Sequence, residues 1–214
     1  MTDLVLSALK ERYPVTERDL GQWKLIRKNG MRFSIRGYET PVGNLCIVQM
    51  KAMLGLMKMD TVVFTALTKD APLFSYDCVH AMGQDTLLLE LYDTQLSPAD
   101  VSALDAVKLS AGDLPDHDLG KHWYDPLKLS PSLAKRGKKL TARYQEISKA
   151  FFTAYLDLLA ASADCVRSEK QAKVKAYTDG LLGNGGPSTD QFKKLIGEDA
   201  TRELFSRFIF SSID

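Results

Sequence analysis

Residues 72–92, PLFSYDCVHAMGQDTLLLELY, predict a β-hairpin with its turn at residues 82–85. In the first arm the side chains alternate between two faces, and Leu73, Asp77 and Val79 fall on the same one. Leu73 and Val79 indicate that this face is buried, so an ionised Asp77 would lose solvation and we expect its pKa to be raised. A proton held near neutral pH is what a general acid requires. The structural alternative is a carboxylate that caps a neighbouring loop or is paired.

Further strands are predicted on the N-terminal side of this hairpin. Asn29-Gly30 separates two runs, residues 22–28 and 31–38, and this dipeptide is the strongest short-range hairpin signal because both turn residues take positive φ. Residues 44–53 and 56–67 are two more strand candidates. Together with the hairpin at 73–92 they predict an antiparallel sheet of about six strands.

Helical patterns occupy the start and the second half of the chain. A short amphipathic helix is expected over 2–12, ended by Pro14, and another short helix is expected to begin with Ser97 as its N-cap. The pattern is helical from Pro131 onward, with helices over 140–159, about 167–181, 188–196 and about 199–211. Strands first and helices last favour an α+β fold with helices packed on an antiparallel sheet.

Composition limits the class of protein. The 214 residues, 45% of them hydrophobic, favour a single domain spanning 1–214, and the net charge of +1 does not favour nucleic acid as a partner. Three widely spaced cysteines indicate a reducing cytoplasm. The N-terminus is too charged for a signal peptide, and no apolar run approaches the ~20 residues that span a membrane. No coiled-coil pattern demands a partner, so a monomer is expected.

Several clusters could carry chemistry. Seven basic residues between 126 and 150 suggest an acidic partner or an anionic ligand, although a solvated helix start is an equal alternative. His117 and His122 lie among aspartates, but their spacing fits no known metal site closely and no metal is predicted. Methionines near Met50 are core filler or a soft wall for a large apolar ligand. No glycine-rich nucleotide loop supports a flavin or nicotinamide site.

Three motifs resemble the ferredoxin-dependent bilin reductases: RGYETP at 36–41, PLFSYD at 72–77 and QFKKLIGE at 191–198, which leads to Leu204-Phe205 and Ile209-Phe210. The resemblance covers roughly 30–94 and 140–214. It implies a three-layer α/β/α sandwich with a central antiparallel sheet and C-terminal helices. It also implies a linear tetrapyrrole such as biliverdin held between sheet and helices, as in phycobilin biosynthesis, and reduced by single electrons from ferredoxin with no bound flavin or metal.

The resemblance assigns candidate catalytic residues. Asp77 falls on the family's catalytic aspartate, which protonates the bilin so that the electron enters a more easily reduced cation. Asp60 stands where some members have a histidine on the preceding strand, and it is expected to be a second proton donor; its alternative is a strand-edge carboxylate. The family's second aspartate is replaced by Gly185-Gly186-Pro187, and Asp190 is the nearest carboxylate to it.

Substrate and partner contacts follow from the same resemblance. The two propionates of a bilin need Arg or Lys partners, and Lys128 with the cluster 135–139 is expected to hold them or to receive acidic ferredoxin. Arg32 and Arg36 are weaker candidates, and Met50 is a candidate pocket wall. Two other functions stay open: a tetrapyrrole-binding protein without catalysis, and an unrelated acyl- or metal-dependent enzyme using His117 and His122.

Overall fold

An eight-stranded antiparallel sheet runs through the computed structural model, which describes residues 1–213. The strand order is β1-β3-β4-β5-β6-β7-β8, and β2 pairs with β3 beside β1. The strands are β1 Thr16–Arg18, β2 Leu25–Lys28, β3 Met31–Thr40, β4 Gly43–Ala52, β5 Met57–Ala66, β6 Leu73–Ala81, β7 Gln84–Tyr92 and β8 Leu133–Gly137. The predicted hairpin at 72–92 is the β6–β7 pair.

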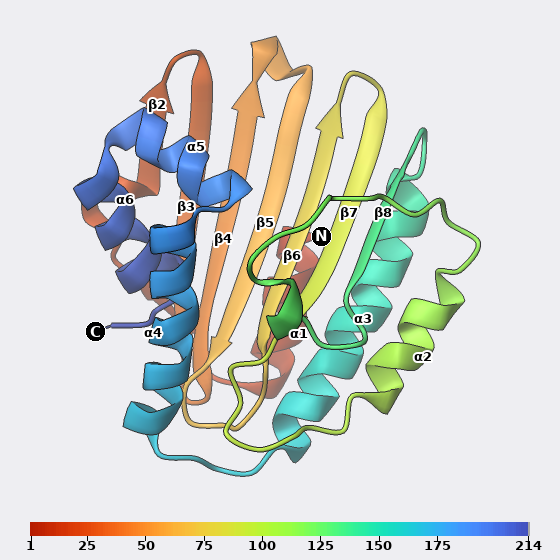
Figure 1. The fold of residues 1–214 in the computed structure, drawn as a ribbon, viewed down its shortest axis with the longest axis vertical. Helices are drawn as coiled ribbons and strands as arrows, with labels where there is room; N and C mark the ends of the chain where they lie inside the picture. The colour runs from red at the N-terminus through yellow and green to blue at the C-terminus, as the bar shows by residue number, and fades with distance from the viewer. Residues whose placement is uncertain (214) are drawn as a thin grey trace.

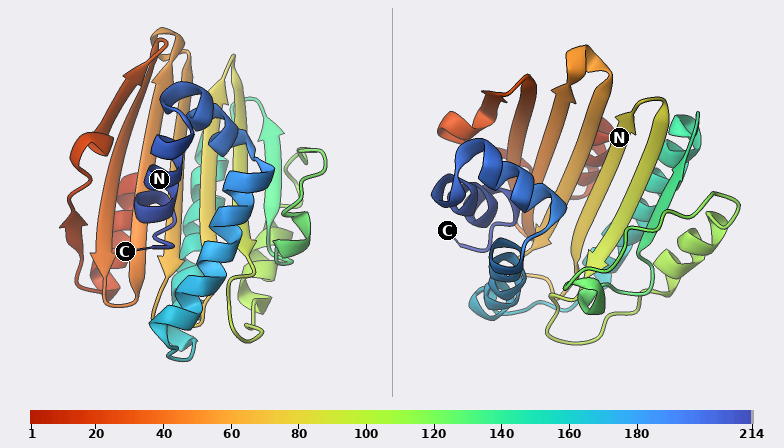
Figure 2. Two further views of the ribbon diagram at one scale, coloured as in Figure 1. Left: turned by 60° about the vertical axis from the view of Figure 1, so that its left-hand side comes forward. Right: turned by 45° about the horizontal axis from the view of Figure 1, so that its top comes forward.

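Helices cover both faces of the sheet, so the α+β prediction and the three-layer α/β/α arrangement are confirmed (Figures 1 and 2). One face carries α1 Thr2–Arg12, α2 Ser102–Ser110 and α3 Thr141–Ala161. The other carries α4 Arg167–Asn184, α5 Pro187–Ile196, α6 Glu198–Glu203 and a π-helical continuation over Leu204–Ile209. Single 3-10 turns occur at Gly21–Lys24, Met53–Gly55 and Asp125–Leu127. No helix within 1–213 is both long and apolar enough to cross a bilayer.

Two hydrophobic cores result, one on each side of the sheet. Alternating side chains of each strand enter different cores, as Ile47 packs towards α1 and α3 while Val48 packs towards α4 to α6. Tyr155 of α3 stacks on Phe74 with ring centroids 5.1 Å apart, and its hydroxyl donates a 2.9 Å hydrogen bond to the Pro72 carbonyl. Because β4 is covered on both faces, nearly all of its residues are buried.

The turn chemistry at Asn29-Gly30 is as predicted. Both residues take positive φ, 51° and 74°, and the register pairs Lys28 with Met31. The β6–β7 turn has the same backbone at Met82 and Gly83, with φ of 52° and 74°. Glycine or asparagine is the usual choice there, so Met82 is an exception.

Some element predictions were wrong. Residues 133–137 form an edge strand, not a helix, because Leu133 and Lys135 alternate as buried positions against β7. The run 22–28 is a strand only over Leu25–Lys28. The helix expected at Ser97 begins at Ser102, whose backbone N–H bonds the Asp100 carboxylate at 3.0 Å. With β1 also missed, the sheet has eight strands where about six were expected.

Candidate functional site

A cavity of about 250 Å³ lies between the sheet and the C-terminal helices. Its floor is formed by β4 to β7, its roof by α4, α5 and the π-helical segment, and Tyr124 borders it from the preceding loop. Most of the lining is apolar or aromatic: Val48, Met59, Val63, Val79, Leu88, Tyr92, Tyr124, Tyr177, Leu181, Phe192, Phe205, Ile209 and Phe210. Such a wall suits a large, flat, conjugated ligand.

Asp77 is an acidic group on the floor of this cavity. Ser75 and Val79 line the cavity beside it, on the strand face expected from the alternation. The β5–β6 register places Thr61 directly opposite Asp77, and the Thr61 hydroxyl donates a hydrogen bond to the Asp77 carboxylate. Burial raises the pKa of Asp77 to about 6; the Thr61 hydrogen bond opposes this shift and the charge of Glu90 adds to it. A carboxyl group with this pKa can hold and release a proton near neutral pH.

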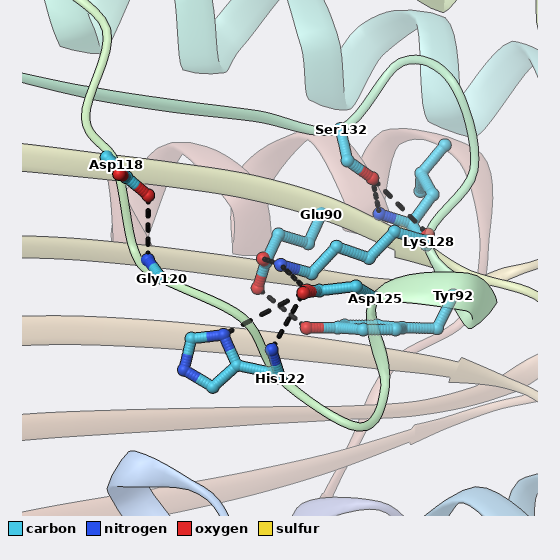
Figure 3. Close-up of polar contacts among 9 residues, drawn as sticks. Glu90, Tyr92, Asp118, Gly120, His122, Asp125, Lys128 and Ser132 are labelled. Atoms are coloured by element: carbon cyan, nitrogen blue, oxygen red, sulfur yellow. Dashed lines mark hydrogen bonds and ion pairs between the residues drawn. The ribbon is translucent and has the colours of Figure 1, made fainter.

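Glu90 is a second acid of the cavity, and sequence reasoning missed it. It lies on β7 opposite Ser75 and is buried. Its two oxygens are held separately: the Tyr92 hydroxyl donates to Oε2 at 2.7 Å, and Lys128 Nζ lies 2.8 Å from Oε1 (Figure 3). The signal was a single acid within the apolar run at 87–91, where a charge needs partners.

Lys128 is fixed at the edge of the cavity by two carboxylates. Its Nζ is 2.8 Å from Glu90 and 3.2 Å from Asp125, and it lies 5.1 Å from the centre of the Tyr124 ring. Partial burial lowers the pKa of Lys128, but these two carboxylates raise it by more, so the ammonium stays charged. Glu90 and Lys128 also line a second cavity of about 220 Å³ with His117.

The roof is attached to the loop before it by Trp123. The indole Nε1 donates a 2.8 Å hydrogen bond to the Gly185 carbonyl at the α4–α5 junction. The ring lies against Gly180, where a Cβ atom would stand only 2.3 Å from it. Tyr177 packs against Tyr92 with the two rings tilted and their centroids 4.6 Å apart, and burial raises the pKa of Tyr177 well above its usual value.

Asp60, the expected second proton donor, does not meet Asp77. Asp60 lies opposite Gln49 and Cys78, on the sheet face that carries α1 and α3. Its carboxylate accepts a 2.9 Å hydrogen bond from Gln49 Nε2. Side chains alternate with a period of two, so the neighbour of Asp77 is Thr61 and not the residue before it.

Three other expected contacts also lie away from the cavity. Arg36 points to the α1 face, where its guanidinium is 3.7 Å from Asp3. Met50 is on the cavity face but is buried in the core, and Met59 beside it lines the cavity instead. Asp190 is exposed on α5, with its carboxylate turned towards Gly185 rather than into the cavity.

The basic cluster at 135–139 is not one surface. Lys135 is buried, and its Nζ donates to the Leu114 carbonyl at 3.0 Å and to Asp116 at 2.7 Å. Among residues 1–213 no Lys or Arg side chain lines the larger cavity. Residues 1–213 also contain no group of three His, Cys, Asp or Glu side chains that could hold a metal ion. His122, a candidate metal ligand in the sequence, instead stacks on Tyr124 with ring centroids 4.9 Å apart.

Comparison with known proteins bears on the fold. No protein-family model matches the chain, and neither does any curated protein sequence. Among solved structures, a crystal structure of phytochromobilin synthase from tomato in complex with biliverdin matches with a TM-score of 0.77. The match covers 99% of this chain and 82% of that chain at 14% sequence identity. This likeness establishes that the two proteins share a fold.

Proposed function

We propose that the chain binds a linear tetrapyrrole, with biliverdin as the first candidate, in the larger cavity and reduces it with electrons from ferredoxin. The observation that carries the proposal is Asp77: a carboxyl group with a pKa of about 6 on the floor of an aromatic-walled cavity. Two further facts support it, namely the fold shared with a biliverdin-bound synthase and the motif resemblance at 72–77.

The chemistry assigned to Asp77 is proton donation. Reducing one double bond of the pigment takes two electrons and two protons. In the first step the Asp77 O–H bond breaks, the proton goes to the pigment, and one electron from reduced ferredoxin enters the cationic ring system. The second electron arrives from a second ferredoxin, and solvent supplies the other proton. A protonated pigment accepts an electron more readily than a neutral one, which is why a carboxyl group with a raised pKa is useful here.

The propionates of the pigment would lie at the cavity edge. No cation lines the cavity within 1–213, whereas Lys128 stands beside it with its charge already shared by Glu90 and Asp125. Lys128 is the proposed propionate partner because it is ion-paired with Glu90 of the cavity lining, and the exposed bases of the 136–139 stretch are the proposed contact for ferredoxin. The proposal includes a cytoplasmic monomer with one domain over 1–214 and no bound flavin, nicotinamide or metal.

Titration with biliverdin under anaerobic conditions, followed by addition of reduced ferredoxin, tests the proposal. Wild type is expected to shift the visible band of the pigment on binding and then to bleach it. Asp77→Asn is expected to keep the binding shift and to slow reduction by about 10²-fold or more. Asp60→Asn is the matched control, because this carboxylate faces the other side of the sheet. Reduction by Asp77→Asn at the wild-type rate would disprove the role of Asp77, and the absence of any band shift would disprove the ligand.

A tetrapyrrole-binding protein without catalysis is the second candidate. It is favoured by the sequence Gly185-Gly186-Pro187, where the family's second aspartate is missing, and by the position of Asp190 outside the cavity. The same titration separates the two functions: this candidate predicts the binding shift but no change in the pigment after reduced ferredoxin is added.

A further inference from the structure

A row of basic side chains crosses the sheet on the face opposite to the cavity. The strand register places Arg32 between Arg27 and Lys51, and it places Lys58 between Lys51 and His80. All five side chains are exposed. Like charges directly opposite each other destabilise a sheet, so this row lowers the stability of the folded protein.

Four of the five bases have no acidic counterpart in the described part of the chain, whereas His80, at the end of the row, lies 2.6 Å from the Asp85 carboxylate through its Nδ1. Among the residues described, no carboxylate forms an ion pair with Arg27, Arg32, Lys51 or Lys58. The segments 27–32 and 51–58 hold these four bases and Lys28 but no acid. The Lys and Arg residues of these two segments carry five positive charges. The whole chain has a net charge of only +1, so the rest of the chain is net negative. Such segregation indicates an anionic partner at this end of the molecule.

Large apolar side chains project from the same end of the sheet. The hairpin ends β2–β3, β4–β5 and β6–β7 lie together at the top of Figure 1. The exposed apolar residues at two of these ends, with their exposed fractions, are Met53 at 53%, Leu54 at 107%, Leu56 at 68% and Met82 at 85%. Met53, Leu54 and Met82 also have φ of 51°, 55° and 52°, in the left-handed region where asparagine or glycine is favoured. Exposure of the apolar side chains to water is therefore unfavourable at these turns, and so is the left-handed backbone that the non-glycine residues adopt.

We propose that this end of the sheet binds the surface of an anionic lipid bilayer. The apolar hairpin ends enter the interface, and the basic row contacts the headgroups behind them. Lys51 and Lys58 are each two residues from the nearest apolar turn residue, Met53 or Leu56, which is about 7 Å along a strand. Interfacial segments bury their apolar side chains ~5–10 Å deep, so these ammonium groups reach headgroup level. The inference depends on neither the cavity nor its ligand.

A bilayer accounts for both features of this surface better than an acidic macromolecule does. A nucleic acid would use the basic row but leave Leu54, Leu56 and Met82 in water. An acidic protein would need two apolar pockets of its own to receive the side chains of the two separate hairpin ends. A fluid interface accepts protruding apolar side chains of any spacing, and its anionic lipids attract each nearby Lys or Arg.

Vesicle co-sedimentation of the full chain tests the proposal. Wild type is expected to sediment with phosphatidylcholine vesicles that contain phosphatidylserine, and to be released by salt and by omission of the anionic lipid. Lys51→Glu with Lys58→Glu is expected to weaken partitioning by at least about tenfold. Leu54→Asp, at an exposed turn position that aspartate tolerates, is expected to weaken it by about tenfold.

Matched controls use residues of the same kind elsewhere on the surface. Leu109→Asp changes a leucine that is 80% exposed on α2, and Lys173→Glu with Lys194→Glu reverses exposed charges on α4 and α5. Both controls should bind vesicles like wild type. The proposal fails if wild type ignores anionic vesicles at low salt, if the controls lose as much binding as the test variants, or if Leu54→Asp leaves partitioning unchanged. Binding to polyglutamate without binding to vesicles would assign the surface to an acidic protein and overturn the proposal.

Discussion

The Thr61 hydroxyl donates a hydrogen bond to the Asp77 carboxylate across the β5–β6 pair. This bond stabilises the ionised carboxylate and so opposes the effect of burial on the pKa of Asp77. The residue that adjusts this acid is therefore a neutral side chain on the adjacent strand, in the place where a second carboxylate was expected. The predictions that follow concern how this pair, its neighbour Glu90 and the roof of the cavity behave.

Thr61→Val should raise the pKa of Asp77 above its value of about 6, because valine keeps the shape of threonine but cannot donate the hydrogen bond. The measurement is a carbon-13 NMR titration of the aspartate side chains. Thr65→Val is the control, since the Thr65 hydroxyl is buried on the same strand with no hydrogen-bond partner. An unchanged or lower pKa in Thr61→Val would show that the hydrogen bond does not favour the ionised form.

Glu90→Gln should lower the pKa of Asp77 towards the ordinary value of 3.8, because the negative charge of Glu90 is one of the causes that raise it. If the chain reduces a pigment, the pH profile of that reaction should move to lower pH as well. Asp60→Asn changes a carboxylate on the other sheet face and should leave the titration of Asp77 as it is in wild type. Equal shifts in both variants would mean that the effect is not local.

Asp77 should make the folded protein less stable at neutral pH than at mildly acidic pH. Its pKa is about 6 in the folded state against 3.8 ordinarily, so between these values the folded state binds more protons than the unfolded chain. The free energy of unfolding therefore falls as pH rises through this interval, and the loss is complete above it.

Asp77→Asn removes this penalty, and since the carboxyl group is partly open to the cavity we expect a gain of roughly 1–2 kcal/mol above about pH 7. Below about pH 3 the variant should show no gain, because the wild-type carboxyl group is then protonated in both states. Urea unfolding at the two pH values measures the difference. A gain of the same size at both would assign the effect to packing rather than to charge.

Lys170 should be a structural lysine whose loss destabilises the junction of α4 with the sheet. It is completely buried, and its ammonium donates to the carbonyls of Ala71 at 2.5 Å and Thr94 at 2.7 Å. Burial lowers its pKa to about 8, although Asp70 opposes the shift. Lys170→Met leaves both carbonyls without this donor and should cost about 2–4 kcal/mol in urea unfolding. Lys173→Met, exposed on the same helix, should change stability by less than about 0.5 kcal/mol; similar losses in both would contradict this role.

Local sequence patterns predicted the strands and helices around the cavity better than the side-chain contacts within it. Alternation alone placed Asp77 with Val79 on one buried face, and the Asn29-Gly30 turn was predictable because its backbone is set by two residues. Asp60 was assigned by analogy of position, and a displacement of one residue along a strand moves a side chain to the other face. Strand β8 was missed because Lys135 occupies one of its buried positions. A lysine is rarely buried unless partners satisfy its charge, and here those partners are Asp116 and the Leu114 carbonyl.

The helices of the roof were predicted from their sequence pattern, but the contacts that attach the roof and hold the acid of the floor were not, because these contacts join residues far apart in the chain. Trp123 bonds the Gly185 carbonyl, and Glu90 is held by Lys128. Neither pair has a spacing that a sequence pattern reveals. Helix propensity argues against a glycine at position 180, inside the C-terminal part of α4, and the reason for it is visible only in the structure, where the Trp123 ring packs against it.

Gly180→Ala should therefore loosen the roof, although alanine is the better helix former. Its Cβ would stand 2.3 Å from the Trp123 ring, so the indole must move and its 2.8 Å hydrogen bond to Gly185 must lengthen or break. We expect a loss of about 1–3 kcal/mol from overpacking and a shift of tryptophan emission to longer wavelength as the ring becomes exposed. Gly183→Ala is the matched control on the same helix: nothing lies within 4 Å of its new Cβ, so it should stabilise the protein by about 0.5–1 kcal/mol and leave the emission unchanged. If Gly180→Ala behaved like Gly183→Ala, the attachment of the Trp123 loop to α4 would not be a tight contact, and the roof of the cavity would not depend on it.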